Sequence, residues 1–286
     1  MPLDQEPSGE KEMSFLEHLE ELRWHVIRSM VAVVIFTIGA FIVAQWIFEN
    51  IIFAPARPDF PTFQFLCRLG DMIGSEGLCV KDIPFKVQSR NMTGQFTMHI
   101  MASFVLGLVI AFPYVVWEFW RFIKPGLQVS ERKYSRGAVG SVSLLFFLGI
   151  SFGYFVIAPW MVYFLANYSI SDMIVNEFDI TSYVSTVVML VLGSGLLFQL
   201  PVVIFFLTKI GIVTPQFLRR YRKHSIVIIL IVAAIVTPPD PLSQTLITIP
   251  LYLLFEISIL ISASVAKRKA KEEAEELLNE QKITPS

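Results

Sequence analysis

The sequence predicts an all-α polytopic membrane protein with six transmembrane helices. Of its 286 residues, 54% are hydrophobic and only 16% are charged, and the mean hydropathy is +0.61. A soluble domain of this length is not so apolar. A bilayer core of about 30 Å needs about 20 apolar residues of helix. Six runs are candidates, of which the fifth is short: Val26 to Phe48, Met98 to Trp117, Gly137 to Tyr163, Tyr183 to Leu207, Ile226 to Val236 and Leu246 to Ala266.

The distribution of Lys and Arg predicts the orientation, because positively charged loops stay in the cytoplasm. Cations gather between the second and third runs, between the fourth and fifth runs, and in the "KRKAK" after the sixth run. The segments 166–179 and 238–243 contain no Lys or Arg. Both termini are therefore expected in the cytoplasm. The stretch 49–97 must then face outward despite its five cations, and long loops do cross regardless of charge.

The ends of the chain are polar and flank one membrane domain. Residues 1–12 are expected to be a disordered tail, 13–266 the six-helix domain and 267–286 a charged cytoplasmic tail. No small-residue cleavage site follows the first apolar run, so we predict no removable signal peptide. The net charge of −1 and the dispersed Lys and Arg give no support to a nucleic-acid partner.

The prolines and the two cysteines of this domain predict local features of its structure. Four prolines lie in the apolar runs and predict bent helices, which form a curved wall more readily than straight ones; they are Pro113, Pro159, Pro201 and Pro250. Cys67 and Cys79 fit neither a zinc site nor a CxxC redox pair. A disulfide between them is plausible if their segment is exported. We expect no metal and no cofactor.

The stretch "SFLEHLEELRW" precedes the first run. At helical spacing, Phe15 and Leu19 share a face, while Glu17 and Glu21 point the other way, so we expect an amphipathic helix lying on the cytoplasmic surface. These acids can simply keep that face hydrated. However, anionic lipid repels an acidic surface helix, so a ligand is the other explanation.

A second carboxylate, Glu131, lies in the cytoplasmic stretch "WEFWRFIKPGLQVSERKYSR". Ser130 can cap a helix that begins at Glu131, whose acid then complements the helix dipole. The aromatic side chains of Trp120 and Phe122 precede it. Because guanidinium groups bind carboxylates in pairs of hydrogen bonds and stack on rings, this composition suits an arginine ligand.

Polar residues within the apolar runs predict function at membrane depth. Gln199 and Glu256 lie in the fourth and sixth runs, where a carboxyl is costly. Glu256 is expected to be protonated or paired, and three roles are open: a structural hydrogen bond, a partner contact, or a proton relay in a secondary transporter. Asp240 lies in "VTPPDPLSQT", which predicts a rigid outer turn between the last two helices.

An intramembrane serine protease is disfavoured. It would need Ser and His to meet inside the bundle, and only the "GSG" at 193–195 with His99 or His224 could supply them. Both histidines lie at predicted helix ends, and Gly and Ser are ordinary packing residues between membrane helices. We therefore predict that the protein is not an enzyme.

Four stretches together resemble the TatC subunit of the twin-arginine protein translocase. "HLEELR" is similar to the family's N-terminal His-Leu-x-Glu-Leu-Arg, "WRFIKPGLQVSERK" to its first cytoplasmic loop and "FQLPVVI" to its fourth helix. "TPPDPLSQTLITIPLYLLFEI" is similar to its last two helices and their hairpin. The match runs from about Ser14 to about Ile261 and keeps the order and spacing of all four stretches.

The resemblance implies a cup-shaped, six-helix receptor of the bacterial inner membrane with both termini in the cytoplasm. Such a receptor binds twin-arginine signal peptides of folded cargo and recruits TatA/TatB-type single-span subunits, and several copies are expected in one complex. The resemblance assigns signal-peptide recognition to Glu21 and Glu131, with Phe122 and Arg23 on the same surface. Pro55 also matches a position that matters in the family.

The sequence departs from the family at Gln199. Many members carry a glutamate there that is associated with single-span partner subunits. Glutamine retains hydrogen bonding but does not ionise, so binding through charge is not expected at this position.

Overall fold

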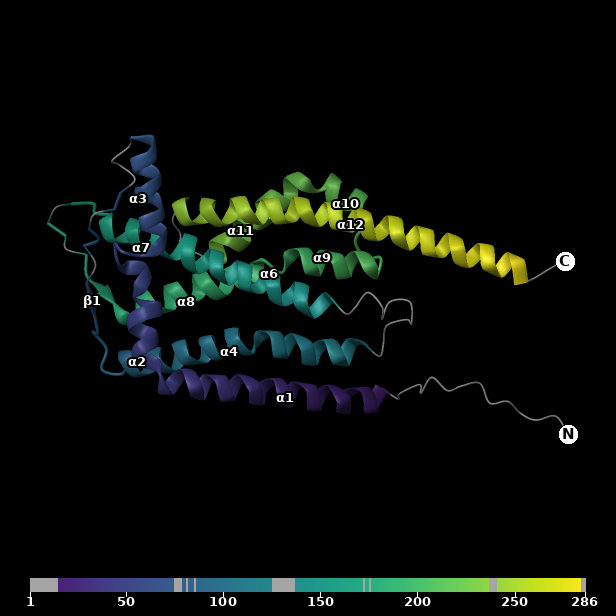
Figure 1. Cartoon of the computed structure of the whole chain (residues 1–286), viewed down its shortest axis with the longest axis horizontal. Coiled ribbons are helices and arrows are strands. Elements are labelled where there is room, and N and C mark those ends of the chain that lie inside the picture. Colours follow the sequence, from purple (N-terminus) through teal and green to yellow (C-terminus); the bar gives the residue numbers. More distant parts are fainter. Residues whose placement is uncertain are drawn as a thin grey trace.

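The protein is almost entirely helical. The computed structural model describes residues 15–74, 79–80, 82–84, 86–124, 137–171, 173–174, 176–236 and 241–283. The long helices run side by side, and α3 stands across one end of them (Figure 1). The elements are α1 (Phe15–Ile42), α2 (Ala44–Ile47), the π-helix η1 (Phe48–Ile52), the 3₁₀ helix η2 (Ala54–Ala56), α3 (Pro61–Ile73), β1 (Val87–Gln88), α4 (Gly94–Ile123), α6 (Ala138–Phe152), the π-helix η6 (Gly153–Ile157), α7 (Ala158–Asn167), β2 (Phe178–Asp179), α8 (Ile180–Leu197), α9 (Leu200–Lys209), α10 (Pro215–Arg220), α11 (Arg222–Val236) and α12 (Pro241–Ile283).

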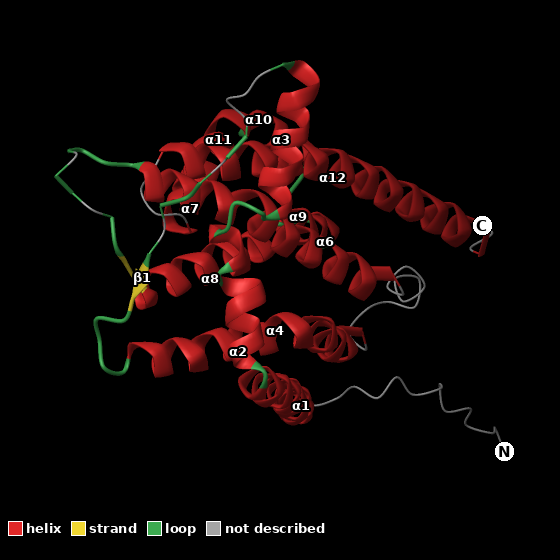
Figure 2. Ribbon diagram, turned by 60° about the vertical axis from the view of Figure 1, so that its left-hand side comes forward, coloured by secondary structure: helices red, strands yellow, loops and turns green. Residues whose placement is uncertain are grey.

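The two ends of the bundle differ. The start of α1 and the end of α4 lie at the same end of the bundle, which we call the terminal end, and α12 projects past them on this side (Figure 1). The helix α3 and the strands lie at the other end, as Figure 2 also shows. Several predictions concern residues outside those described, namely the tail 1–12, Glu131 with its cap Ser130, and Asp240.

Five of the described helical stretches are long and apolar enough to cross a membrane. They are Glu20–Ile42, Gly94–Ile123, Ala138–Asn167, Ile180–Lys209 and Gln244–Lys271. Many large apolar side chains on α1 are exposed, among them Met30, Ile35 and Ile42, as expected for a helix that faces lipid. The prediction of an all-α membrane protein is confirmed. The fifth predicted span, α11, has 15 residues and is about 22 Å long, which is shorter than the bilayer core.

The amphipathic surface helix predicted before the first run is wrong. Those residues form the first turns of α1, which continues without a break from Phe15 to Ile42. The stretch contains no proline, and its first glycine is Gly39, so nothing interrupts the backbone hydrogen bonds. The acidic residues therefore extend the first membrane helix instead of lying beside it.

Glycines allow the long helices to approach closely. A Cβ atom on Gly107 of α4 would lie 2.6 Å from the backbone nitrogen of Thr37 on α1. On α6, a Cβ on Gly149 would lie 2.6 Å from the carbonyl oxygen of Ser194 on α8. Small residues let membrane helices pack with their backbones in contact. These two positions fix α1 against α4 and α6 against α8.

The four prolines divide equally between helix interiors and helix starts. Pro113 and Pro250 lie within α4 and α12, whereas Pro159 and Pro201 lie in the first turns of α7 and α9. Because Pro159 has no N–H, the carbonyl of Phe155 loses its usual helical donor. The hydroxyl of Thr62 on α3 donates a hydrogen bond to this carbonyl. The proline thus provides an anchor for the helix that crosses the bundle.

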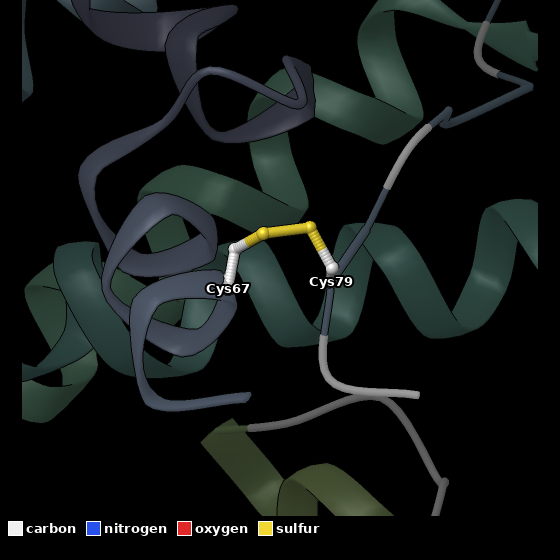
Figure 3. The surroundings of a disulfide bond; sticks show 2 residues. All are labelled: Cys67 and Cys79. Carbon is white, nitrogen blue, oxygen red and sulfur yellow. A yellow bond between two sulfur atoms is a disulfide. The ribbon is translucent and has the colours of Figure 1, made fainter. Parts of the chain in front are cut away.

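The end opposite the terminal end is tied together by short elements. Strands β1 and β2 pair in parallel, with Val87 opposite Phe178. Asp179 caps α8 by accepting hydrogen bonds from the backbone and hydroxyl of Thr181, and these bonds hold the pKa of that carboxyl below its usual range. A disulfide joins Cys67 on α3 to Cys79 in the segment that follows (Figure 3).

Candidate functional site

A buried acid and a buried histidine connect α1 to α4 at the terminal end. The Nδ1 atom of His25 lies 2.5 Å from the Oε2 atom of Glu118. The side chain of His25 is only 7% exposed and that of Glu118 only 1%. On α4, the hydroxyl of Tyr114 donates to Oε1 of Glu118 at 3.0 Å, and Nη1 of Arg121 lies 3.5 Å from the same oxygen. Both carboxylate oxygens therefore have partners, as a buried charge requires.

Glu21 lies one turn before His25 and is only partly satisfied. Its Oε1 atom is 4.0 Å from Nε2 of His25, and its side chain is 37% exposed. Its other oxygen, Oε2, is buried and has no hydrogen-bond partner among the described residues. A buried acceptor without a donor is costly and rare. Glu21 therefore keeps hydrogen-bonding capacity that the described residues do not use, on a side chain that is partly exposed.

Aromatic and cationic side chains surround these acids. The ring of Phe122 lies 6.3 Å from the imidazole of His25, centroid to centroid. The guanidinium of Arg121 lies over Trp117, 4.9 Å from its ring centroid. Arg23 is exposed, and its Nη2 atom is 3.9 Å from Oε1 of Glu20. The surface thus combines an available carboxylate with rings, which suits a guanidinium ligand.

The predicted site residues therefore divide into groups. Glu21 and Phe122 both lie next to His25 and thus belong to one cluster. Arg23 points to solvent beside them, and Glu131 lies outside the described residues. Pro55 is buried in η2, which contacts α7 and does not belong to this cluster.

Gln199 forms a contact within its own chain. Its Nε2 atom donates to the carbonyl oxygen of Val142 on α6 at 3.0 Å. Its Oε1 atom is buried and lacks a hydrogen-bond partner among the described residues. Gln199 occupies the N-cap position of α9, whose first turn contains Pro201, and it thus lies at the turn that follows α8. The side chain thereby connects this turn to the neighbouring helix.

Glu256 is paired in a separate cluster. The Nη2 atom of Arg222 on α11 lies 2.7 Å from Oε2 of Glu256 on α12, and the hydroxyl of Tyr252 donates to Oε1 at 3.1 Å. The pairing predicted for Glu256 is therefore present. Both oxygens of Glu256 are thus engaged in contacts within the chain, which weakens the case for a proton relay in a secondary transporter.

Sequence reasoning missed Glu118. It lies in the aromatic stretch that ends the second run, so it resembles a residue at the water boundary. The available signal was the spacing of Tyr114 and Glu118 on one helix face, together with a histidine in the first helix, His25. That signal does not say which two helices are neighbours, and only the fold brings these residues together.

Comparisons with known proteins identify the family. Residues 17–250 match the family model of the Sec-independent protein translocase protein, TatC. The chain belongs to the TatC family. A TatC protein of Blattabacterium sp. subsp. Periplaneta americana is 40% identical over 260 residues, covering 90% of this chain and 98% of that relative. TatCy of Bacillus subtilis is 33% identical, covering 92% of this chain and 94% of the relative.

Solved TatC structures share the fold. A crystal structure of the twin-arginine translocase receptor TatC superposes with a TM-score of 0.67 at 31% identity, covering 87% of this chain and 99% of that one. A second structure, of the receptor in DDM, gives a TM-score of 0.69 at 32% identity, covering 86% and 99%. The resemblance predicted from four short stretches is confirmed. The chain is a membrane component of the Sec-independent protein translocase family, with a role in transport.

Proposed function

We propose that this TatC protein is a receptor that binds the twin-arginine signal peptides of folded proteins at its terminal end. The observation that carries this proposal is the Oε2 atom of Glu21, which has no hydrogen-bond partner among the described residues, in a cluster where Glu21 and the ring of Phe122 both lie next to His25. An arginine of the peptide can donate two hydrogen bonds to this carboxylate while its guanidinium plane packs on an aromatic ring. Arg23 borders the same surface, and Glu131 would supply the second acid.

The pair formed by His25 and Glu118 supports this role. It holds the first turns of α1 against α4, so that Glu21 and Phe122 lie next to the same imidazole. A binding site needs its contact groups held by residues that are themselves fixed. In this proposal, His25 and Glu118 position the site and Glu21 binds the ligand.

The proposed topology places this surface in the cytoplasm. In this topology, α11 is a sixth span, and the six spans form a cup-like arrangement in the bacterial inner membrane. Both termini lie in the cytoplasm, because the Lys-rich and Arg-rich segments follow α4, α9 and the membrane part of α12. A helix as short as α11 requires local thinning of the bilayer. Further copies of this chain and single-span TatA/TatB-type subunits would bind to it within the membrane. Gln199 and Glu256 would be polar contacts for these partners.

Peptide binding tests the proposal directly. The purified protein is titrated with a signal peptide that carries Arg-Arg and with the same peptide carrying Lys-Lys. We expect clear preference for Arg-Arg, and affinity about tenfold weaker in Glu21→Gln and in Glu131→Gln, because each removes a charged hydrogen bond. Glu20→Gln is the matched control, since Glu20 is exposed and makes only a 3.9 Å contact to Arg23. Equal affinity for both peptides, or equal loss in the Glu20 variant, would refute the assignment.

A further inference from the structure

The helix α3 packs against the rest of the protein along one face only. Phe63 and Gly70 are buried on this face, and Leu66 packs against the same apolar cluster as Phe63. These positions recur at intervals of three or four residues, so they share one side of the helix. Most of the remaining circumference of α3 is exposed.

The exposed circumference is divided into a polar stripe and an apolar stripe. Each stripe follows the spacing of three or four residues that places side chains on one side of a helix. The polar stripe consists of Gln64, Arg68 and Asp71, and the apolar stripe consists of Phe65, Leu69 and Met72. Phe65 is 62% exposed and Met72 is 82% exposed. A helix with a protein-facing side, a polar side and a second apolar side suits a position where protein, water and lipid meet.

Contacts at the start of α3 place it beside the third candidate membrane span and not beyond the end of that span. The hydroxyl of Thr62 donates to the carbonyl oxygen of Phe155, and the ring of Phe63 lies 6.0 Å from that of Tyr163, centroid to centroid. Both partners belong to the candidate span Ala138–Asn167. Phe155 precedes the end of this span by 12 residues, which is about 18 Å of helix. The start of α3 therefore lies at the depth of one leaflet.

The direction of α3 extends it from the bundle into the surrounding membrane. It runs across the long helices and thus along the plane of the bilayer (Figure 1). One end of α3 reaches past α7 and α12, as Figures 1 and 2 both show. The last residue of the helix, Ile73, is accordingly 69% exposed. An apolar side chain that projects from the bundle at this depth meets hydrocarbon.

Two contacts fix the rotation of α3 about its own axis. The hydrogen bond from Thr62 to Phe155 holds its first turn, and the disulfide between Cys67 and Cys79 holds its middle (Figure 3). The apolar stripe therefore cannot turn toward the protein without breaking them. A specific protein interface typically uses about 20–30 residues on each side, far more than this stripe offers. Lipid needs no such extended complementary surface.

We propose that α3 is an interfacial helix whose apolar stripe inserts into the hydrocarbon of the leaflet on the far side from the terminal end. The polar stripe faces the water above this leaflet, and the buried face attaches the helix to the bundle. Burial of the apolar stripe in lipid provides the binding free energy. This membrane contact goes beyond the proposed function, because it uses no residue of the peptide site and needs no signal peptide.

Spin labels measure the depth of each stripe. The two native cysteines are bonded to each other, so one introduced cysteine is the only free thiol. Leu69→Cys and Met72→Cys report on the apolar stripe, and Gln64→Cys and Asp71→Cys are the matched controls on the polar stripe. Each labelled protein is reconstituted in vesicles of phosphatidylcholine and phosphatidylglycerol. Its EPR power saturation is then measured with oxygen, which partitions into hydrocarbon, and with a water-soluble nickel chelate.

We expect the labels on the apolar stripe to lie about 5–10 Å below the lipid phosphates, accessible to oxygen and protected from nickel. The labels on the polar stripe should remain accessible to nickel. Adding Met72→Asp to the protein labelled at position 69 should shift that label toward water, because it places a carboxylate in the stripe. Adding Arg68→Gln instead should leave the depth of the label unchanged.

Two results would refute the proposal. Equal access of nickel to both stripes would show that α3 stands in water. Protection of the apolar stripe from both oxygen and nickel would show that protein covers it. Dipolar broadening of the EPR spectrum in that case would identify the covering protein as a second copy of this chain.

Discussion

Nδ1 of His25 lies 2.5 Å from Oε2 of Glu118, although the two residues are 93 positions apart in the chain. Removing one member of such a buried pair leaves the other without compensation, which typically costs about 3–5 kcal/mol. We therefore expect Glu118→Leu to lower the melting temperature in detergent strongly. The double variant His25→Leu with Glu118→Leu should recover much of the loss, because two apolar groups of similar size can replace a buried pair.

The double-mutant cycle decides whether these residues act as a pair. A coupling free energy near zero, with the two single losses simply adding, would contradict the interaction. Peptide binding gives a second readout. The single variants are tested at a temperature at which they remain folded. A weaker preference for the Arg-Arg peptide in these variants would support a positioning role for the pair.

Gly107 should tolerate no larger residue. A Cβ atom there would lie 2.6 Å from the backbone nitrogen of Thr37, which cannot move without shifting α1. We expect Gly107→Ala to reduce stability by about 1–3 kcal/mol, the usual cost of overpacking. Gly140→Ala is the matched control, since a Cβ on Gly140 meets nothing within 4 Å. Equal melting temperatures for the two variants would mean that α1 and α4 do not pack as closely as described.

Glu256 should act as a structural group and not as a proton carrier. Arg222 holds its carboxylate at 2.7 Å, so Arg222→Met should lower the melting temperature more than Arg219→Met, a change at an exposed arginine. The double variant Arg222→Met with Glu256→Gln should be more stable than Arg222→Met alone, because it leaves no unpaired carboxylate. The contrary result would be proton uptake into vesicles that contain this chain alone. If Glu256→Gln abolished that uptake, the protein would be a transporter.

The disulfide between Cys67 and Cys79 should stabilise the end of the bundle opposite the terminal end. It closes a loop with a sequence separation of 12, for which chain-entropy estimates give about 3 kcal/mol. We expect a reducing agent to lower the melting temperature of the protein. The variant with both cysteines replaced by Ser should melt at the same temperature with and without the reductant. Labelling of both thiols before reduction would show that the bond is absent.

Hydropathy predicts the membrane helices well for a physical reason. In lipid, every backbone polar group must be satisfied within the segment, so a long apolar run has almost no alternative to a helix. The same logic explains the error at the start of α1. Amphipathic spacing shows which face is polar, but only a helix breaker would separate that stretch from the span, and neither Pro nor Gly occurs between Phe15 and Gly39.

The candidate site was predictable only in part. Glu21 and Phe122 lie in stretches that resemble the TatC family, so the sequence identified them as candidates. The pairing of His25 with Glu118, and that of Arg222 with Glu256, depends on which helices are neighbours. Periodicity within one helix does not contain that information. The choice of neighbouring helices comes from packing, for example where the backbones of α4 and α1 meet at Gly107 and Thr37.

Helix α12 is much longer than the membrane is thick. Its 43 residues extend about 64 Å, whereas the hydrocarbon core is about 30 Å. The last turns of the helix extend as a rod past the ends of α1 and α4 (Figure 1), beyond the candidate span Gln244–Lys271. A fluorescent protein fused behind Ile283 would be carried clear of the lipid surface, which makes this end of the chain the natural attachment point for counting molecules in single assemblies.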